Sequence, residues 1–191
     1  MIDASEHDLD ENIRISREAS LYARTFGVSV EAELGRIGTT DYVESDNDEE
    51  LYTDPDESLR FVRETGVDAL AVSVGTAHGV YQVRQPKVDI ARLKAIRAKT
   101  DVHLVLHDGS GVPADMIRQA IELPGGGISK VNIATDLELA LLRVLGREER
   151  MTNAECAALP ADLLRRGQDA VQRIAEEKIE HYLGSKGKAI L

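Results

Sequence analysis

Ionisable or polar residues stand at the end of each short apolar run in this sequence. They are Asp3, then Glu31 and Glu33, then Gly75-Thr76-Ala77-His78, then His107, and finally Asn132 with Thr135. Two histidines with carboxylates nearby suit a borderline cation such as zinc. A catalytic zinc usually has three protein ligands and one open position. His78 and His107 are candidate ligands, and the third is not evident. His7 and His181 read as surface residues, and His103 starts its run, at the wrong end for this site.

A glycine-rich turn follows one of these histidines and indicates a binding site for an anion. The segment His107-Asp108-Gly109-Ser110-Gly111-Val112-Pro113 reads as a strand end, a turn and a helix start. Backbone N–H groups in such a turn can cradle a phosphate. The next apolar run ends in Asn132-Ile133-Ala134-Thr135-Asp136, which again reads as a strand end, a turn and a helix start.

Each of these signals also has a purely structural explanation. A histidine at a strand end is more often a hydrogen-bonded core residue than a ligand. Glu31 and Glu33 point to the same side of a strand and could form ion pairs with Arg36 or another base. Gly109 and Gly111 could simply form a tight turn. The joint placement of all the signals at one end of the strands is what favours a functional site.

The elements that must position these residues alternate between strands and helices. Strand-length apolar runs without polar alternation cover residues 28–34, 69–74, 102–106 and 130–133, as buried parallel strands do. Helical patterns cover residues 11–25, 54–66, 89–99, 113–123, 136–145 and 161–183. Counting residues 1–3 as the end of a strand, the pattern predicts five β/α units and a parallel sheet.

Two architectures compete for such a pattern, an open doubly wound sheet and part of an eight-fold (β/α)₈ barrel. An open sheet gathers its ligand groups at one switch point. A barrel gathers them from many strand ends at its C-terminal mouth. Because every predicted strand ends in polar groups, the sequence favours the barrel.

Composition narrows the class of protein. The 191 residues carry a net charge of −11, which argues against nucleic acid and anionic membranes as partners. Cys156 is the single cysteine, there is no apolar run long enough to span a membrane, and acidic residues rather than a signal peptide follow the start. We therefore expect a cytoplasmic protein.

Several motifs together resemble the class II, zinc-dependent ketose-bisphosphate aldolases, closest to the fructose/tagatose-bisphosphate branch. They are Val30-Glu31-Ala32-Glu33-Leu34-Gly35, Gly75-Thr76-Ala77-His78-Gly79-Val80-Tyr81, Leu106-His107-Asp108-Gly109-Ser110-Gly111-Val112-Pro113 and Lys130-Val131-Asn132-Ile133-Ala134-Thr135. The likeness runs from Met1 to the tail at residues 184–189.

The resemblance implies a role for individual residues. His78 and His107 would be zinc ligands, and Asp3 and Glu33 would lie near a second cation. The groups that would hold the substrate and its phosphate are Gly79, Asp108, Gly109, Ser110, Asn132, Ile133, Ala134 and Thr135. The family uses zinc to polarise the ketone of a sugar phosphate, and it implies homodimers or homotetramers. No lysine is placed like a nucleophile, since Lys130 reads as the start of its strand.

The chain also departs from the family pattern. It has no Leu-Asp-His-Gly motif, which in the family carries the acid/base and the third zinc histidine, and it begins at the expected fourth strand. We therefore expect a single partial barrel domain over residues 1–191, comprising strands four to eight and a C-terminal helix, that is inactive alone. Asp41 stands where the family has a longer proton-abstracting Glu, and Asp108 stands where a small residue is usual.

Three hypotheses remain open at this point. The chain is a truncated zinc-dependent aldolase, a non-catalytic chain that keeps a phosphate or zinc site or pairs with a partner subunit, or a sister aldolase acting on a deoxy-keto-sugar acid phosphate.

Overall fold

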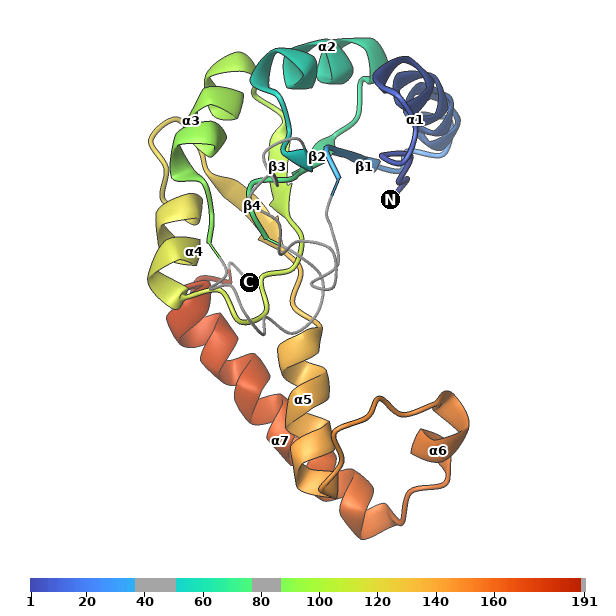
Figure 1. Cartoon of the computed structure of the whole chain (residues 1–191), viewed down its shortest axis with the longest axis vertical. Helices are drawn as coiled ribbons and strands as arrows, with labels where there is room; N and C mark the ends of the chain where they lie inside the picture. The colour runs from blue at the N-terminus through green and yellow to red at the C-terminus, as the bar shows by residue number, and fades with distance from the viewer. Residues whose placement is uncertain (37–50, 77–86, 190–191) are drawn as a thin grey trace. The chain divides into compact units, whose positions relative to one another are not determined.

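The computed structural model describes residues 1–36, 51–76 and 87–189, and within them it contains one parallel sheet. The sheet has the order β1 (Glu31–Leu34), β2 (Ala69–Val72), β3 (His103–Leu106) and β4 (Ile128–Val131), as Figure 1 shows. Ile2 adds a parallel bridge to Ala32 on the outer side of β1, and its N–H donates to Glu31 O at 2.8 Å. Residues 1–3, predicted to end a fifth strand, thus contribute one isolated bridge, and the sheet in the described residues has four strands.

Helices connect and follow the strands. They are α1 (Leu9–Arg24), α2 (Pro55–Thr65), α3 (Ile90–Lys99), α4 (Ala114–Ile121), α5 (Thr135–Leu145), α6 (Asn153–Ala157), α7 (Ala161–Glu177) and a π-helical turn, η2 (Lys178–Tyr182). Every helix expected from the sequence is present with bounds shifted by a few residues. The short helix α6 was not predicted.

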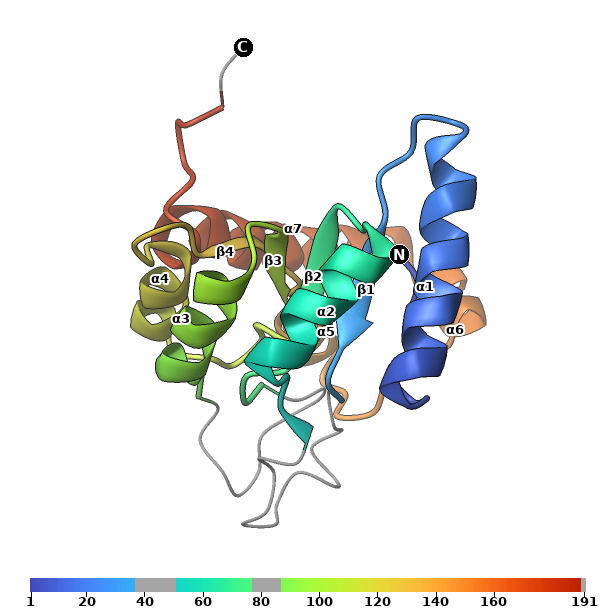
Figure 2. The same ribbon diagram turned by 90° about the horizontal axis from the view of Figure 1, so that it is seen from above.

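The chain divides into two compact units, residues 1–132 and residues 133–191. In the first unit, α1 packs on α2 and α2 on α3, and α1 to α4 follow one another along one face of the sheet (Figures 1 and 2). In the second unit, α5 packs along α7. No helix among the described residues has the length and apolar character needed to cross a membrane.

The core of the first unit lies between the sheet and its helices. Its fully buried side chains include Leu70, Val72, Leu104 and Leu106 from the strands and Phe61, Leu93, Ile96 and Ile117 from the helices. Side chains alternate between the two faces of a strand. Because Ala32 and Leu34 are buried on the helix-covered face, Glu31 and Glu33 must point to the opposite face.

The carboxyl end of β1 is held by Thr53, which precedes α2. The hydroxyl of buried Thr53 accepts from Ser73 N at 2.8 Å and donates to Leu34 O, so it joins the ends of β1 and β2. Gly35 has φ of 86°, and a Cβ added there would approach the Thr53 hydroxyl to 2.7 Å. This turn therefore requires glycine.

Candidate active site

His107 lies between two carboxylates at the carboxyl end of β3. Its Nε2 is 3.0 Å from Glu31 Oε1 and its Nδ1 is 3.2 Å from Glu33 Oε2. The His107 side chain is 6% exposed, and those of Glu31 and Glu33 are 13% and 5% exposed. Glu31 and Glu33 are two residues apart on one strand, so both reach the same ring from the same face.

Lys130 completes this cluster from β4. Its Nζ is 2.7 Å from Glu31 Oε2. Lys130 was expected to begin its strand, but it is the third of the four residues of β4. The bases that pair with the two glutamates are His107 and Lys130. Arg36, the other base considered, donates instead to the backbone oxygen of Glu6 at 3.1 Å.

The Glu31–Lys130 contact also reveals the curvature of the sheet. β1 and β4 are separated by two other strands. In a flat sheet three spacings of about 4.8 Å would hold them about 14 Å apart, with side chains standing perpendicular to the sheet. An ion pair of 2.7 Å between them is the contact expected where the sheet curls toward this face, as the wall of a barrel does.

Charge and burial shift the protonation of the cluster. The hydrogen bond with Glu33 is the largest influence on His107 and raises its pKa, with Glu31 adding to it, against the opposing effect of burial. For Glu31, burial acts to raise the pKa, but the hydrogen bonds from Lys130 and His107 together outweigh it and hold the pKa below 4.5. These directions favour the charged imidazolium form of His107 and the ionised form of Glu31.

The turn after His107 is anchored to neighbouring strands. Thr76, after β2, donates its hydroxyl to His107 O at 2.9 Å. Asn132 N donates to Leu106 O at 2.9 Å, and Gly109 N donates to Asn132 O at 2.9 Å. The N–H of Gly109 is thus already used, so a phosphate could accept it only at the expense of this bond.

Asp108 adopts the left-handed backbone conformation, with φ of 55°. It is the only non-glycine residue with positive φ in the part of the chain that the structure describes. Left-handed backbone is costly for residues with a Cβ, and Asp tolerates it better than most. The expectation that a non-glycine residue strains this turn is confirmed.

The remaining predicted residues are not all brought to this cluster. The Asp3 carboxylate accepts from Ser5 N at 3.0 Å and is exposed. His103 lies at the opposite end of β3 from His107, 3.3 Å from the Ser129 hydroxyl, as expected.

The residues predicted to bind substrate are placed as follows. Ser110 is buried in the turn after Gly109. Ile133, Ala134 and Thr135 lie at the start of the second unit, where Thr135 begins α5. Asp41, His78 and Gly79 lie outside the described residues.

The residues of the cluster fit a zinc ion by their chemistry. An imidazole beside a buried carboxylate is a donor set that zinc favours. No group of three or more His, Cys, Asp or Glu side chains within residues 1–36, 51–76 and 87–189 is arranged to enclose a metal ion. His107 and Glu33 can therefore supply part of a coordination shell.

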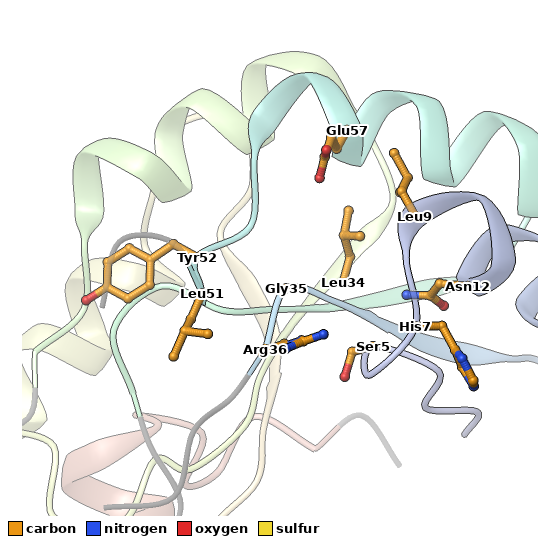
Figure 3. Close-up of a pocket in the computed structure, with 10 residues that line it drawn as sticks. All are labelled: Ser5, His7, Leu9, Asn12, Leu34, Gly35, Arg36, Leu51, Tyr52 and Glu57. Atoms are coloured by element: carbon orange, nitrogen blue, oxygen red, sulfur yellow. The ribbon is translucent and has the colours of Figure 1, made fainter. Parts of the chain in front are cut away.

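A separate cavity of about 320 Å³ lies between the starts of α1 and α2 (Figure 3). It is lined by Ser5, His7, Leu9, Asn12, Leu34, Gly35, Arg36, Leu51, Tyr52 and Glu57. Because Leu34 points to the helix-covered face and Glu33 to the other, this cavity and the His107 cluster lie on opposite faces of β1. None of the predicted ligands lines it.

Comparison with known proteins identifies the family. Residues 1–188 match the family model described as fructose-bisphosphate aldolase class-II. The chain belongs to this family. The α/β fold, with its parallel strands and a polar cluster at their carboxyl ends, is that of an aldolase barrel.

Solved structures of aldolases resemble the chain over almost its whole length. The YdjI aldolase from Escherichia coli K12 is 38% identical with a TM-score of 0.76, and the match covers 98% of this chain and 61% of that one. A candidate fructose-1,6-biphosphate aldolase from Coccidioides immitis is 32% identical with a TM-score of 0.80, covering 98% and 63%. Fructose-bisphosphate aldolase from Campylobacter jejuni is 25% identical with a TM-score of 0.68, covering 95% and 59%. This chain therefore spans about three fifths of the length of these proteins.

Sequence reasoning did not assign the contacts of Glu31 and Lys130. The spacing of Glu31 and Glu33 showed that both carboxylates share a face. Lys130 lies in a four-residue strand that also contains polar Ser129, so its charge alone did not distinguish it. Their pairing depends on the curvature of the sheet, which no local pattern encodes.

Proposed function

We propose that this chain provides the zinc-binding and dihydroxyacetone-phosphate-binding part of an aldehyde-lyase. The reaction would be cleavage of a ketose 1,6-bisphosphate of the fructose or tagatose type to dihydroxyacetone phosphate and glyceraldehyde 3-phosphate. The observation that carries the proposal is His107, held between half-buried Glu31 and buried Glu33 immediately before a glycine-rich turn in a class-II aldolase sequence.

The metal-binding role rests on His107, His78 and Glu33. His107 and His78 would hold the zinc ion, and Asp3 and Glu33 would serve a second cation. When bound, zinc supplies Lewis-acid polarisation of a carbonyl group. Half-buried Glu31 and buried Glu33 orient the His107 ring and would offset the charge of the cation.

The substrate-binding role rests on the turns that follow β3 and β4. Gly79, Asp108, Gly109 and Ser110 are proposed to contact the phosphate, and Asp41 is proposed as the proton-abstracting base. Buried Ser110 brings a hydroxyl to the turn that follows His107.

The segment after β4 is proposed to complete substrate binding. The backbone N–H and C=O of Asn132 both bond to the segment 106–109, so its side-chain amide is the group available to a substrate. Ile133, Ala134 and Thr135, in the second unit, are assigned to phosphate binding by the family resemblance. Cytoplasmic location and assembly into homodimers or homotetramers are further parts of the proposal.

Zinc content of the purified chain tests this function directly. We expect about one zinc per chain, a strong loss in His107→Ala, and no loss in the matched variant His103→Ala at the other end of the same strand. Equal zinc in the chain and in His107→Ala, or no zinc in folded chain, would contradict the proposal. Cleavage assays with fructose and tagatose 1,6-bisphosphate, run with the missing β/α units supplied, then identify the sugar.

A second candidate is a chain that binds zinc and phosphate without turnover. The observation in its favour is that the 191 residues contain no Leu-Asp-His-Gly motif to supply the acid/base. Zinc binding without cleavage of either bisphosphate, even when a second chain supplies the missing Leu-Asp-His-Gly motif, would favour this candidate, and robust cleavage would exclude it.

A further inference from the structure

Both acidic residues in the first turn of α5 are paired with a basic residue. Asp136 Oδ2 is 2.6 Å from Lys178 Nζ, and Glu138 Oε2 is 2.8 Å from Nη2 of Arg150. Asp136 directly follows Thr135, the first residue of α5, which the proposed function assigns to phosphate binding. A carboxylate at this point repels a phosphate unless a nearby cation offsets its charge.

The two ion pairs differ in their exposure to solvent. The side chains of Lys178 and Asp136 are 15% and 22% exposed, whereas that of Arg150 is 79% exposed. Water and salt screen exposed charges strongly, and they screen half-buried charges much less. Lys178 is therefore the cation with the larger influence on the charge at the start of α5.

The end of α7 holds the Lys178 ammonium group in one place. Lys178 Nζ lies 4.0 Å from the centre of the Tyr182 ring, a distance at which a cation is attracted to an aromatic face, and Tyr182 is buried. Lys178 opens the π-helical turn η2, in which Leu183 N donates to Lys178 O at 2.8 Å. Such turns are rare and frequently occur at functional sites. A carboxylate and a ring thus fix Lys178, which does not extend freely into solvent.

The packing of α7 on α5 does not depend on this ion pair. The two helices approach so closely that a Cβ added at Gly167 would collide with the Leu141 side chain. A half-buried ion pair often adds little net stability compared with apolar side chains of similar size. Apolar side chains could therefore join the helices equally well, so the property that Lys178 contributes beside Thr135 is its charge.

We propose that Lys178 is a positioning residue for phosphate binding, which acts through Asp136. It holds the Asp136 carboxylate and offsets its charge, so that the start of α5 accepts a phosphate dianion. This inference rests on the proposed function, because it requires that Thr135 contact the substrate phosphate.

Binding of dihydroxyacetone phosphate to the full chain in the presence of zinc, followed by ³¹P NMR titration, tests this role. Lys178→Met should weaken binding about tenfold, because it leaves the Asp136 charge beside the phosphate, and Lys178→Arg should retain most of the affinity. Asp136→Asn breaks the same ion pair but removes the negative charge, so it should bind at least as tightly as the parent. Arg150→Met, which removes the exposed cation that pairs with Glu138, is the matched control and should stay within about twofold of the parent.

The double variant Lys178→Met/Asp136→Asn carries neither charge and should recover most of the affinity lost in Lys178→Met. Melting curves establish that each variant is folded. Equal weakening in Lys178→Met and Asp136→Asn, or parent-like binding in Lys178→Met, would overturn the inference and leave the proposed function intact. If Lys178→Met does not fold, the double variant decides in its place, and binding about tenfold weaker than the parent would overturn the inference. A folded parent chain that binds no dihydroxyacetone phosphate would overturn the proposed function itself.

Discussion

At the residue scale, Asp108 combines a strained backbone with a position beside the metal histidine. A left-handed conformation costs a residue with a Cβ about 1–2 kcal/mol, whereas glycine adopts it freely. Part of the stability gained by replacing Asp108 with glycine is offset, because glycine also increases the entropy of the unfolded chain. We expect Asp108→Gly to raise the free energy of unfolding by about 0.5–1 kcal/mol, measured by urea denaturation.

The control for this prediction keeps the Cβ and removes the carboxylate. Asp108→Ala retains the steric cost and loses the polar groups that make Asp tolerant of this conformation. It should be less stable than the parent by about 1 kcal/mol. If Asp108→Gly and Asp108→Ala were equally destabilised, side-chain contacts of Asp108 rather than backbone strain would dominate.

The His107 cluster makes the stability of the metal-free chain depend on pH. The folded pKa of His107 is raised above its usual 6.5, so its stabilising contribution is complete below 6.5 and is lost as pH rises through the higher folded value. The folded pKa of Glu31 is lowered from 4.5, so its contribution is present above 4.5 and is lost as pH falls. These two groups thus favour stability most between about 4.5 and 6.5.

Urea denaturation in the presence of a chelator, from pH 6 to pH 9, measures this effect. His107→Gln should remove most of the decline in stability above pH 6.5. His103→Gln, at the exposed start of the same strand, should keep it. A parent-like decline in His107→Gln would show that another group is responsible.

The sequence predicted those parts of the site that depend on residues close together in the chain, and missed the contact between distant residues. His107 and Glu33 were predicted because strand ends and a two-residue spacing are local patterns. The strain at Asp108 was also predicted, since a turn that favours glycine was occupied by another residue. The Glu31–Lys130 pair was not, because those two residues are 99 positions apart and lie on strands that are not neighbours in the sheet.

At the scale of elements, one buried hydrogen-bond chain attaches α1 to β1 behind the site. The Asn12 side chain donates to Glu33 O at 3.0 Å and accepts from the Ser16 hydroxyl at 3.0 Å. Asn12 and Ser16 are 2% and 0% exposed. We expect Asn12→Ala to destabilise the chain by about 2 kcal/mol, because it leaves buried polar groups without partners.

A double-mutant cycle tests whether these two residues act as a unit. Ser16→Ala alone should cost about 1 kcal/mol, and the double variant should cost less than the sum of the single variants. Urea denaturation measures all three. Additive losses would mean that the Asn12–Ser16 bond contributes nothing to the attachment.

Element boundaries were predicted to within a few residues where capping signals exist. Asp54 before Pro55 caps α2 and Gly66 ends it in the left-handed conformation, as the sequence indicated. The helix α6 was missed because it buries no residue and so has no apolar periodicity. Its one signal is local: Thr152 and Glu155 form a capping box, a pattern that the sequence displays as Thr-x-x-Glu.

At the scale of the whole molecule, the choice between an open sheet and a barrel followed from the strand ends. Polar groups at every strand end predicted a barrel mouth, and the 2.7 Å contact between β1 and β4 gives the curvature that this requires. The division into residues 1–132 and 133–191 has no counterpart in the sequence, because no change of composition or flexible linker marks residue 132.

The net charge of −11 should also influence the cation site. At about 10 mM salt the screening length is about 30 Å, so acidic residues far from the site also attract a divalent cation. At about 0.1 M salt the screening length shortens to about 10 Å, and this attraction weakens. We therefore expect Co²⁺ affinity to fall several-fold between about 10 and 200 mM sodium perchlorate, measured by absorbance titration.

A charge-reversal variant separates net charge from the local cluster. Glu148 and Glu149 are exposed, and replacing both with Lys changes the net charge from −11 to −7, since each reversal adds two charges. This variant should bind Co²⁺ more weakly than the parent at low salt and equally at high salt. Equal affinity of both proteins at every salt concentration would mean that His107 and its carboxylates alone determine cation binding, because contacts this short are little screened by salt.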